Sequence, residues 1–82
     1  MKIFMADIIR EVAAAHGLSV ADLTGPRHIH RFVLARHEAM WRCRHETGQS
    51  FPQIGRALGG RDHSTIWHGV RAHEQRRAEL TA

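Results

Sequence analysis

The chain has 82 residues, which suffice for one small domain with a modest hydrophobic core. Hydrophobic residues make up 43% of the chain, which favours folding, and the formal net charge of +4 is compatible with a polyanionic partner. A single cysteine excludes an intramolecular disulfide framework, and no apolar run approaches the ~20 residues of a membrane helix, so we expect a cytoplasmic protein.

Hydrophobic periodicity predicts two helices in the first third of the chain. The first spans residues 3–16, where apolar side chains recur at spacings of three and four. A short second helix spans 19–23, with Ser19 as its expected N-cap, and a Thr-Gly-Pro sequence ends it. The expected apolar face of the first helix comprises Phe4, Ile8, Val12 and Ala15.

Three further helices are predicted after a basic stretch of the chain. They span about 32–47, 51–58 and 66–80, by the same periodicity argument. No segment alternates with the period of a strand. We therefore expect an all-α fold: one compact five-helix domain, with a helix-turn-helix at about 51–80 and a basic loop at about 25–31. The buried stripe of the third helix is predicted to comprise Phe32, Ala35, Ala39, Met40 and Cys43.

The connection between the last two helices is the most informative segment. Gly59 and Gly60 permit a sharp turn, because glycine adopts positive φ at little steric cost. Asp62 and Ser64 are good N-cap candidates for the helix that follows. Its start carries Arg, Asp, His, Ser and Thr, whose side chains can contact base edges in a major groove. A helix, a glycine turn and such a helix indicate a DNA-binding helix-turn-helix.

Residues 51–69 closely resemble the signature of a known family. They read Phe-Pro-Gln-Ile-Gly-Arg-Ala-Leu-Gly-Gly-Arg-Asp-His-Ser-Thr-Ile-Trp-His-Gly, where the family reads Leu-Pro-Glu-Ile-Gly-x-x-Phe-Gly-Gly-Arg-Asp-His-Thr-Thr-Val. That family is the C-terminal DNA-binding domain of the bacterial replication initiator DnaA. The resemblance extends upstream through residues 20–23, the basic loop and residues 39–40, and covers most of the chain.

The resemblance implies binding to a DnaA box, a short asymmetric duplex sequence. The family inserts its recognition helix into the major groove and an arginine of the basic loop into the adjacent minor groove. By position, Arg44 would contact phosphate, and Asp62, His63 and Ser64 would lie near base edges. The DNA-facing positions implied are Arg27, His28, Arg31, Arg44, Phe51, Pro52, Gln53, Arg61, Asp62, His63, Ser64 and Thr65.

The chain departs from the family pattern at two of these positions. His28 stands where the family has its minor-groove arginine, so either Arg27 or Arg31 substitutes for it or the minor-groove preference is altered. Ser64 replaces a threonine and lacks the methyl group that can pack on a thymine. Both departures favour a shifted sequence preference.

We expect no metal, cofactor or catalysis. Although the chain has eight histidines, His63, His68 and His73 are five residues apart, which on a helix turns them away from one another. No Gly-x-x-x-x-Gly-Lys-Ser/Thr loop is present to bind a nucleotide. The length excludes an ATPase domain within these residues, and the ends of the chain favour a small stand-alone protein that carries only the DNA-binding module.

The sequence therefore predicts a nucleoid-associated regulator of transcription or replication that binds double-stranded DNA, with DnaA-box-like sites as targets. The intact Gly-Gly-Arg-Asp-His core favours occlusion of the initiator at its boxes, whereas His28 and Ser64 favour regulation at other sites. The alternative is a protein-interaction module whose basic face docks an acidic partner. No membrane or nucleotide partner is predicted, and the sequence leaves a protein partner open.

Overall fold

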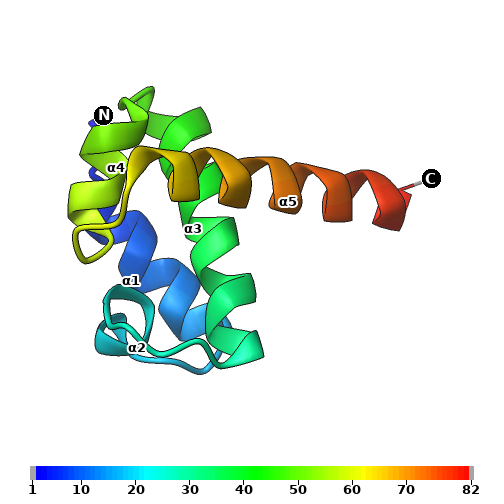
Figure 1. Cartoon of the computed structure of the whole chain (residues 1–82), viewed down its shortest axis with the longest axis horizontal. Helices are drawn as coiled ribbons and strands as arrows, with labels where there is room; N and C mark the ends of the chain where they lie inside the picture. The colour runs from blue at the N-terminus through cyan, green and yellow to red at the C-terminus, as the bar shows by residue number, and fades with distance from the viewer. Residues whose placement is uncertain (1, 82) are drawn as a thin grey trace.

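The computed structural model describes residues 2–81, and this part of the chain forms five helices and no strand (Figure 1). The predicted all-α fold is thereby confirmed. Each helix lies close to its expected place in the sequence. The helices are α1 (Met5–Ala15), α2 (Val20–Thr24), α3 (His30–Thr47), α4 (Phe51–Ala57) and α5 (His63–Thr81).

Two short helices begin with reciprocal capping boxes. At α2, the Asp22 amide donates to Ser19 Oγ at 3.1 Å and the Ser19 amide donates to Asp22 Oδ2 at 3.0 Å. At α4, Ser50 and Gln53 make the same exchange at 3.2 and 2.9 Å. These bonds satisfy amides that the first turn of a helix leaves unpaired. Such short helices need them, because few internal hydrogen bonds hold five or seven residues in place.

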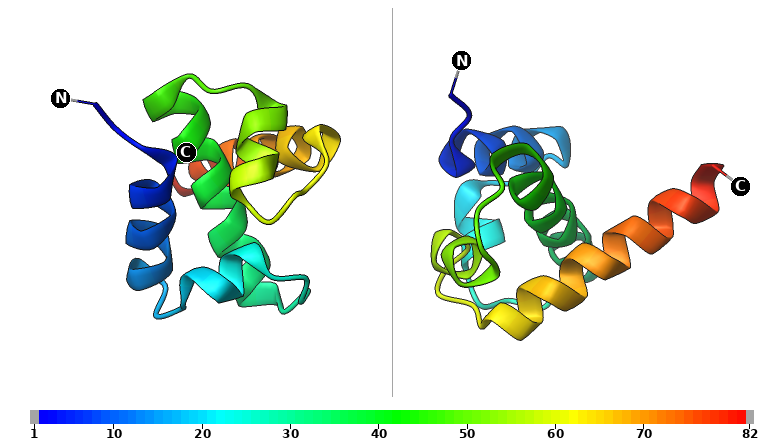
Figure 2. Two further views of the ribbon diagram at one scale, coloured as in Figure 1. Left: turned by 90° about the vertical axis from the view of Figure 1, so that its left-hand side faces the viewer. Right: turned by 90° about the horizontal axis from the view of Figure 1, so that it is seen from above.

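The core lies where α3 is packed between α1 on one side and α5 on the other, with α4 closing one end (Figure 2). At the crossing of α3 and α5, Gly69 lies against Met40 and His37, and a Cβ on Gly69 would collide with the Met40 sulfur. The two helices therefore approach closely at that point. The largest fully buried side chains are Ile8, Leu23, Met40, Ile54, Leu58, Ile66, Val12 and Cys43.

The apolar face of α1 differs from the expectation. Phe4 precedes the helix and is 54% exposed, and Ala15 in the last turn is also exposed. The buried residues are instead Ile8, Ile9, Val12 and Ala13, two adjacent pairs one turn apart. This face is wider than the predicted stripe because α1 packs against α2 and α4 as well as α3. In α3, by contrast, the whole predicted stripe is buried.

The boundaries of two helices also shift. The third helix begins at His30, two residues earlier than predicted, because the Ile29 carbonyl accepts hydrogen bonds from the Phe32 and Val33 amides at 2.9 and 3.0 Å. The fifth begins at His63, three residues early, after Asp62. Part of the basic stretch and the polar residues after the glycine turn are therefore helical.

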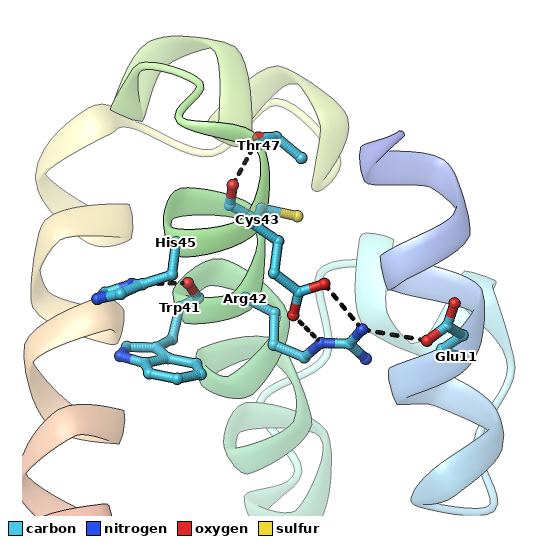
Figure 3. Close-up of polar contacts among 7 residues, drawn as sticks. Glu11, Trp41, Arg42, Cys43, His45 and Thr47 are labelled. Atoms are coloured by element: carbon cyan, nitrogen blue, oxygen red, sulfur yellow. Dashed lines mark hydrogen bonds and ion pairs between the residues drawn. The ribbon is translucent and has the colours of Figure 1, made fainter. Parts of the chain in front are cut away.

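A polar cluster on α3 ties this helix to α1 (Figure 3). The Arg42 guanidinium donates to both carboxylate oxygens of Glu46 at 2.6 and 3.1 Å and to Glu11 of α1 at 3.1 Å. These hydrogen bonds hold the pKa of Arg42 above its ordinary value. Nearby, burial raises the pKa of the Cys43 thiol to about 12, so it stays protonated and packs as a small apolar group. None of the helices described is long and apolar enough to cross a membrane.

Candidate nucleic-acid interface

The turn between α4 and α5 is held tightly by the backbone. Gly59 and Gly60 have φ of 82° and 80°, and the amides of Gly60 and Arg61 both donate to the Gly55 carbonyl at 2.9 Å. A Cβ at Gly59 would collide with the Thr24 carbonyl oxygen. The turn therefore requires glycine at position 59 for its backbone conformation and for its close contact with the end of α2.

Asp62, which caps α5, and the first turn of the helix present four polar side chains to solvent: Asp62, His63, Ser64 and Thr65. Asp62 Oδ2 accepts the Ser64 amide at 2.9 Å, which caps the helix, and its Oδ1 lies 3.5 Å from His63 Nδ1. The hydrogen bond from the Ser64 backbone lowers the pKa of Asp62, so this carboxylate is ionised at neutral pH. These side chains are ordered by the helix and its cap but are otherwise free to bind a ligand.

Arg61 is oriented differently from the sequence expectation. Its guanidinium turns inward and donates to three backbone carbonyls: Leu58 at 2.5 Å, Gly25 at 2.5 Å and Leu23 at 3.3 Å. Burial lowers its pKa. The residue predicted to face DNA therefore joins the glycine turn to the end of α2 and the start of the basic loop.

Arg36 was not singled out by the sequence, yet it is the most buried charged residue in the structure, 3% exposed. It donates to the carbonyls of Leu23 and Asp22, both at 2.8 Å, and of Gly25 at 2.9 Å. Two guanidiniums thus share the Leu23 and Gly25 carbonyls, which the short α2 leaves without helical partners. We call Arg36, Arg61 and these carbonyls the arginine clamp.

The two cations of the arginine clamp lie close enough to disfavour each other. Burial lowers the pKa of Arg36, and the nearby positive charge of Arg61 lowers it further, while Asp22 opposes the effect. A charged group is kept in such a place only where carbonyl dipoles compensate for lost hydration. The sequence did hold a signal for Arg36, because it lies four residues after Phe32 and four before Met40, on the buried face of α3.

The basic loop lies beside the glycine turn. A cleft of about 370 Å³ is lined by His28 of the basic loop, by Gly59 and Arg61 of the turn and by Thr65 of α5. Arg27 is exposed and makes no side-chain hydrogen bond or ion pair to any residue in 2–81. Arg31 instead lies in the first turn of α3, where its guanidinium reaches the His16 carbonyl at 3.5 Å. The side chain of Arg27 is therefore free of hydrogen bonds within residues 2–81, whereas that of Arg31 is held near the end of α1.

The corner between α3 and α4 carries the remaining predicted residues. Arg44 donates to the Gln49 carbonyl at 2.8 Å, and its guanidinium carbon lies 5.0 Å from the centre of the Phe51 ring. This cation–π contact orients an exposed cation at the start of α4. Pro52 and Gln53 follow and are exposed. The predicted residues thus form three groups: the basic loop, the first turn of α5, and this corner.

Comparison with known proteins identifies the helix-turn-helix. The model of the bacterial DnaA protein helix-turn-helix matches residues 5–72, which include α1 to α4 and the first half of α5. The chain belongs to this family. A DnaA-type helix-turn-helix is a DNA-binding domain; the assignment of the motif itself to α4 and α5 stays a prediction.

Individual relatives agree with this assignment. The chain is 39% identical over 74 residues to the chromosomal replication initiator protein DnaA of Ruegeria sp. (strain TM1040), a match that covers 90% of this chain. It is 41% identical over 81 residues, or 99% of this chain, to the DnaA of Caulobacter vibrioides (strain NA1000 / CB15N). In both cases the chain spans 16% of the length of the DnaA relative. Dechloromonas aromatica DnaA is 42% identical over 67 residues, 82% of this chain and 14% of the relative.

One further histidine of this DnaA-type domain, His37, lies in the packing between two helices. Among the described residues, no three His, Cys, Asp or Glu side chains are grouped so that they could hold a metal ion. His37 lies between α3 and α5, where its Nδ1 is 3.0 Å from Arg76 Nη2. Burial, and then the positive charge of Arg76, lower the pKa of His37 to about 4. His37 is therefore neutral at pH 7 and can accept a hydrogen bond from Arg76.

Proposed function

We propose that this chain is a regulator of transcription or replication that binds duplex DNA sequence-specifically through α4 and α5, without an ATPase of its own. The observation that carries the proposal is the exposed and capped first turn of α5, positioned beside the basic loop by the arginine clamp. A binding surface that is ordered before DNA arrives loses less conformational entropy on binding.

We assign the discrimination between DNA sequences to the residues at the start of α5. As an ionised acceptor, Asp62 suits the amino group of cytosine, while His63 and Ser64 can donate to or accept from base edges in the major groove. Thr65 lines the cleft toward His28 and suits the groove wall. Each well-made base contact contributes about 1–3 kcal/mol of discrimination against a wrong base.

We assign the part of the DNA affinity that does not depend on sequence to exposed cationic side chains. Arg44 is held over Phe51 and presents its guanidinium to solvent, which suits a phosphate contact at the start of α4, next to Pro52 and Gln53. For the minor groove we favour Arg27 over Arg31, because Arg27 has no other side-chain partner among the described residues and Arg31 is drawn toward α1. His28 would then line the groove entrance.

Two roles remain within this function. Occlusion of DnaA at its boxes is supported by the Gly-Gly-Arg-Asp-His sequence at residues 59–63. Regulation at different sites is supported by His28 and Ser64. In either role we propose a cytoplasmic, nucleoid-associated protein whose partner is double-stranded DNA and which needs no nucleotide.

Fluorescence anisotropy with a labelled duplex carrying a DnaA box, and with a scrambled duplex of equal length, tests the proposal across a salt series. Tight binding to the box, well above the scramble and falling steeply with salt, supports a box reader. Equal binding to both duplexes supports the regulator of other sites, and selection from random sequence then identifies the target. No binding to either duplex at moderate salt contradicts DNA binding and favours a module that docks an acidic protein.

A variant of His63 and a control variant elsewhere on the surface test the base-reading contact. His63→Ala should lower the ratio of box to scramble affinity, because it removes a base-reading side chain. Arg10→Gln is the matched control: Arg10 is an exposed arginine of α1, paired with Asp7, outside the three groups. If His63→Ala left the ratio unchanged while box binding persisted, our assignment of the reading surface would be wrong.

A further inference from the structure

Trp67 is an unusual surface residue. It is 43% exposed although tryptophan is large and apolar, whereas Phe32 is buried and Trp41 and Phe51 are only partly exposed. It lies on α5 directly after the buried Ile66, so its exposure follows from the helical period rather than from a loop. A large aromatic side chain that faces solvent from a rigid helix is typical of an interaction surface.

Trp67 shares a face of α5 with the base-reading residues. At 3.6 residues a turn, Arg71 lies within about 20° of Ser64 around the helix axis, and Trp67 within about 60°. The buried Ile66, Gly69 and Val70 lie on the opposite side. Trp67 and Arg71 therefore continue the surface that begins with the first turn of α5, about 4 and 10 Å further along the axis.

The two side chains are already paired. The Arg71 guanidinium carbon lies 5.2 Å from the centre of the Trp67 ring, and the His68 ring approaches the indole edge at 5.0 Å between centroids. The cation covers one face of the indole and leaves the rest exposed. Both groups are therefore held in place before any ligand binds, and they combine an apolar plate with a positive charge.

Resting on the proposed function, we propose that the Trp67–Arg71 pair binds the sugar–phosphate wall of the major groove. The indole packs on deoxyribose, and the guanidinium pairs with a phosphate. A helix is about 10–12 Å wide, which is about the width of the major groove. Only its N-terminal end therefore reaches the base edges, and residues one or two turns further along meet the sugar–phosphate wall of the groove. The contact ends at Arg71, since Glu74 and Gln75 follow on the exposed surface.

The positive charge on this face is the reason for choosing DNA as the occupant. Arg71 makes no ion pair with an acidic residue among residues 2–81, although Glu74 lies nearby on the helix. An apolar plate flanked by an uncompensated guanidinium suits a polyanion with apolar sugars better than the apolar core of a protein interface, where unpaired charges are depleted.

The two tryptophans provide a direct test, since Trp41 lies on α3 in contact with His45, His73 and Arg77. In Trp41→Phe, all tryptophan emission reports Trp67. Its acrylamide quenching should fall at least twofold when the DnaA-box duplex saturates the protein. In the matched variant Trp67→Phe, emission from Trp41 should be quenched equally with and without DNA. Far-UV circular dichroism checks that each variant is folded.

Affinity measurements supply the second readout. Trp67→Ala should weaken box binding about tenfold, and Arg71→Gln should lower the slope of log affinity against log salt by about 0.9, the loss of one phosphate contact. Unchanged quenching of Trp67 in a saturated complex, or unaltered affinity in both variants, overturns the inference and leaves the proposed function in place. Failure of the unaltered chain to bind any duplex overturns both.

Discussion

Removal of Arg36 tests the arginine clamp most directly. In Arg36→Met, a shorter unbranched apolar side chain replaces arginine, so the aliphatic part of the side chain is largely kept and the three hydrogen bonds of the guanidinium are lost. Arg61 still donates to the Leu23 and Gly25 carbonyls, whereas the Asp22 carbonyl loses its side-chain partner. The substitution therefore isolates the hydrogen bonds of one buried cation.

The expected loss of stability follows from these contacts. Hydrogen bonds from a charged donor contribute about 1.5–3 kcal/mol each, but relief of the buried charge and the contacts that Arg61 retains offset part of that sum. We expect the free energy of unfolding to fall by about 2–4 kcal/mol, a large share of the roughly 4–12 kcal/mol typical of a domain this size. The midpoint of thermal unfolding should fall by roughly 10–25 °C.

Urea unfolding followed by circular dichroism measures the change. The matched control is Arg42→Met, which breaks a more exposed ion-pair cluster and should cost about 1 kcal/mol or less. A loss below about 0.5 kcal/mol for Arg36→Met would refute the argument, because the buried hydrogen bonds would then contribute no more than surface contacts. Since Arg36 and Arg61 share two carbonyls, the double variant with Arg61→Met should deviate from additivity by about 0.5–3 kcal/mol.

Three further predictions concern the turn, pH and salt. In urea unfolding, Gly59→Ala should lower the free energy of unfolding by at least about 1 kcal/mol more than Gly60→Ala. Both substitutions strain a positive φ, but only a Cβ at position 59 also collides with backbone. Equal losses of stability would contradict the close contact. Because the folded pKa of His37 lies below its ordinary value, stability is full above pH 6.5 and should fall by about 1–2 kcal/mol between pH 7 and 5. His37→Gln should flatten that slope, and an identical slope would assign it to another group. Arg44→Gln should weaken binding to box and scramble alike and reduce the salt slope by about 0.9, whereas a selective loss on the box would make it a base contact.

Local signals in the sequence predicted the helices well. The stripe of α3 and the cap at Ser19 follow from spacing and side-chain chemistry that act within one turn. The end of α1 was harder, since which of Phe4, Ala15 or Ile9 is buried depends on where α2 and α4 lie. Periodicity describes one helix, whereas burial depends on its neighbours.

In the candidate site, too, local features were predicted and features that depend on tertiary contacts were not. The exposed polar turn at residues 62–65 was predicted because its chemistry and position in the motif are local. The inward turn of Arg61 was not, because its carbonyl partners lie up to 38 residues away in the chain. An arginine in a basic, DNA-binding sequence is most simply interpreted as a phosphate ligand, and only tertiary contacts distinguish one that supports the fold.

The arginine clamp holds the start of the basic loop through hydrogen bonds to main-chain oxygens alone. Any residue has such an oxygen, so the amino acids at positions 27–29 are free to change without loosening the loop's attachment to α3 and α5. Substitutions at these positions therefore alter the chemistry of the loop surface while the architecture stays the same.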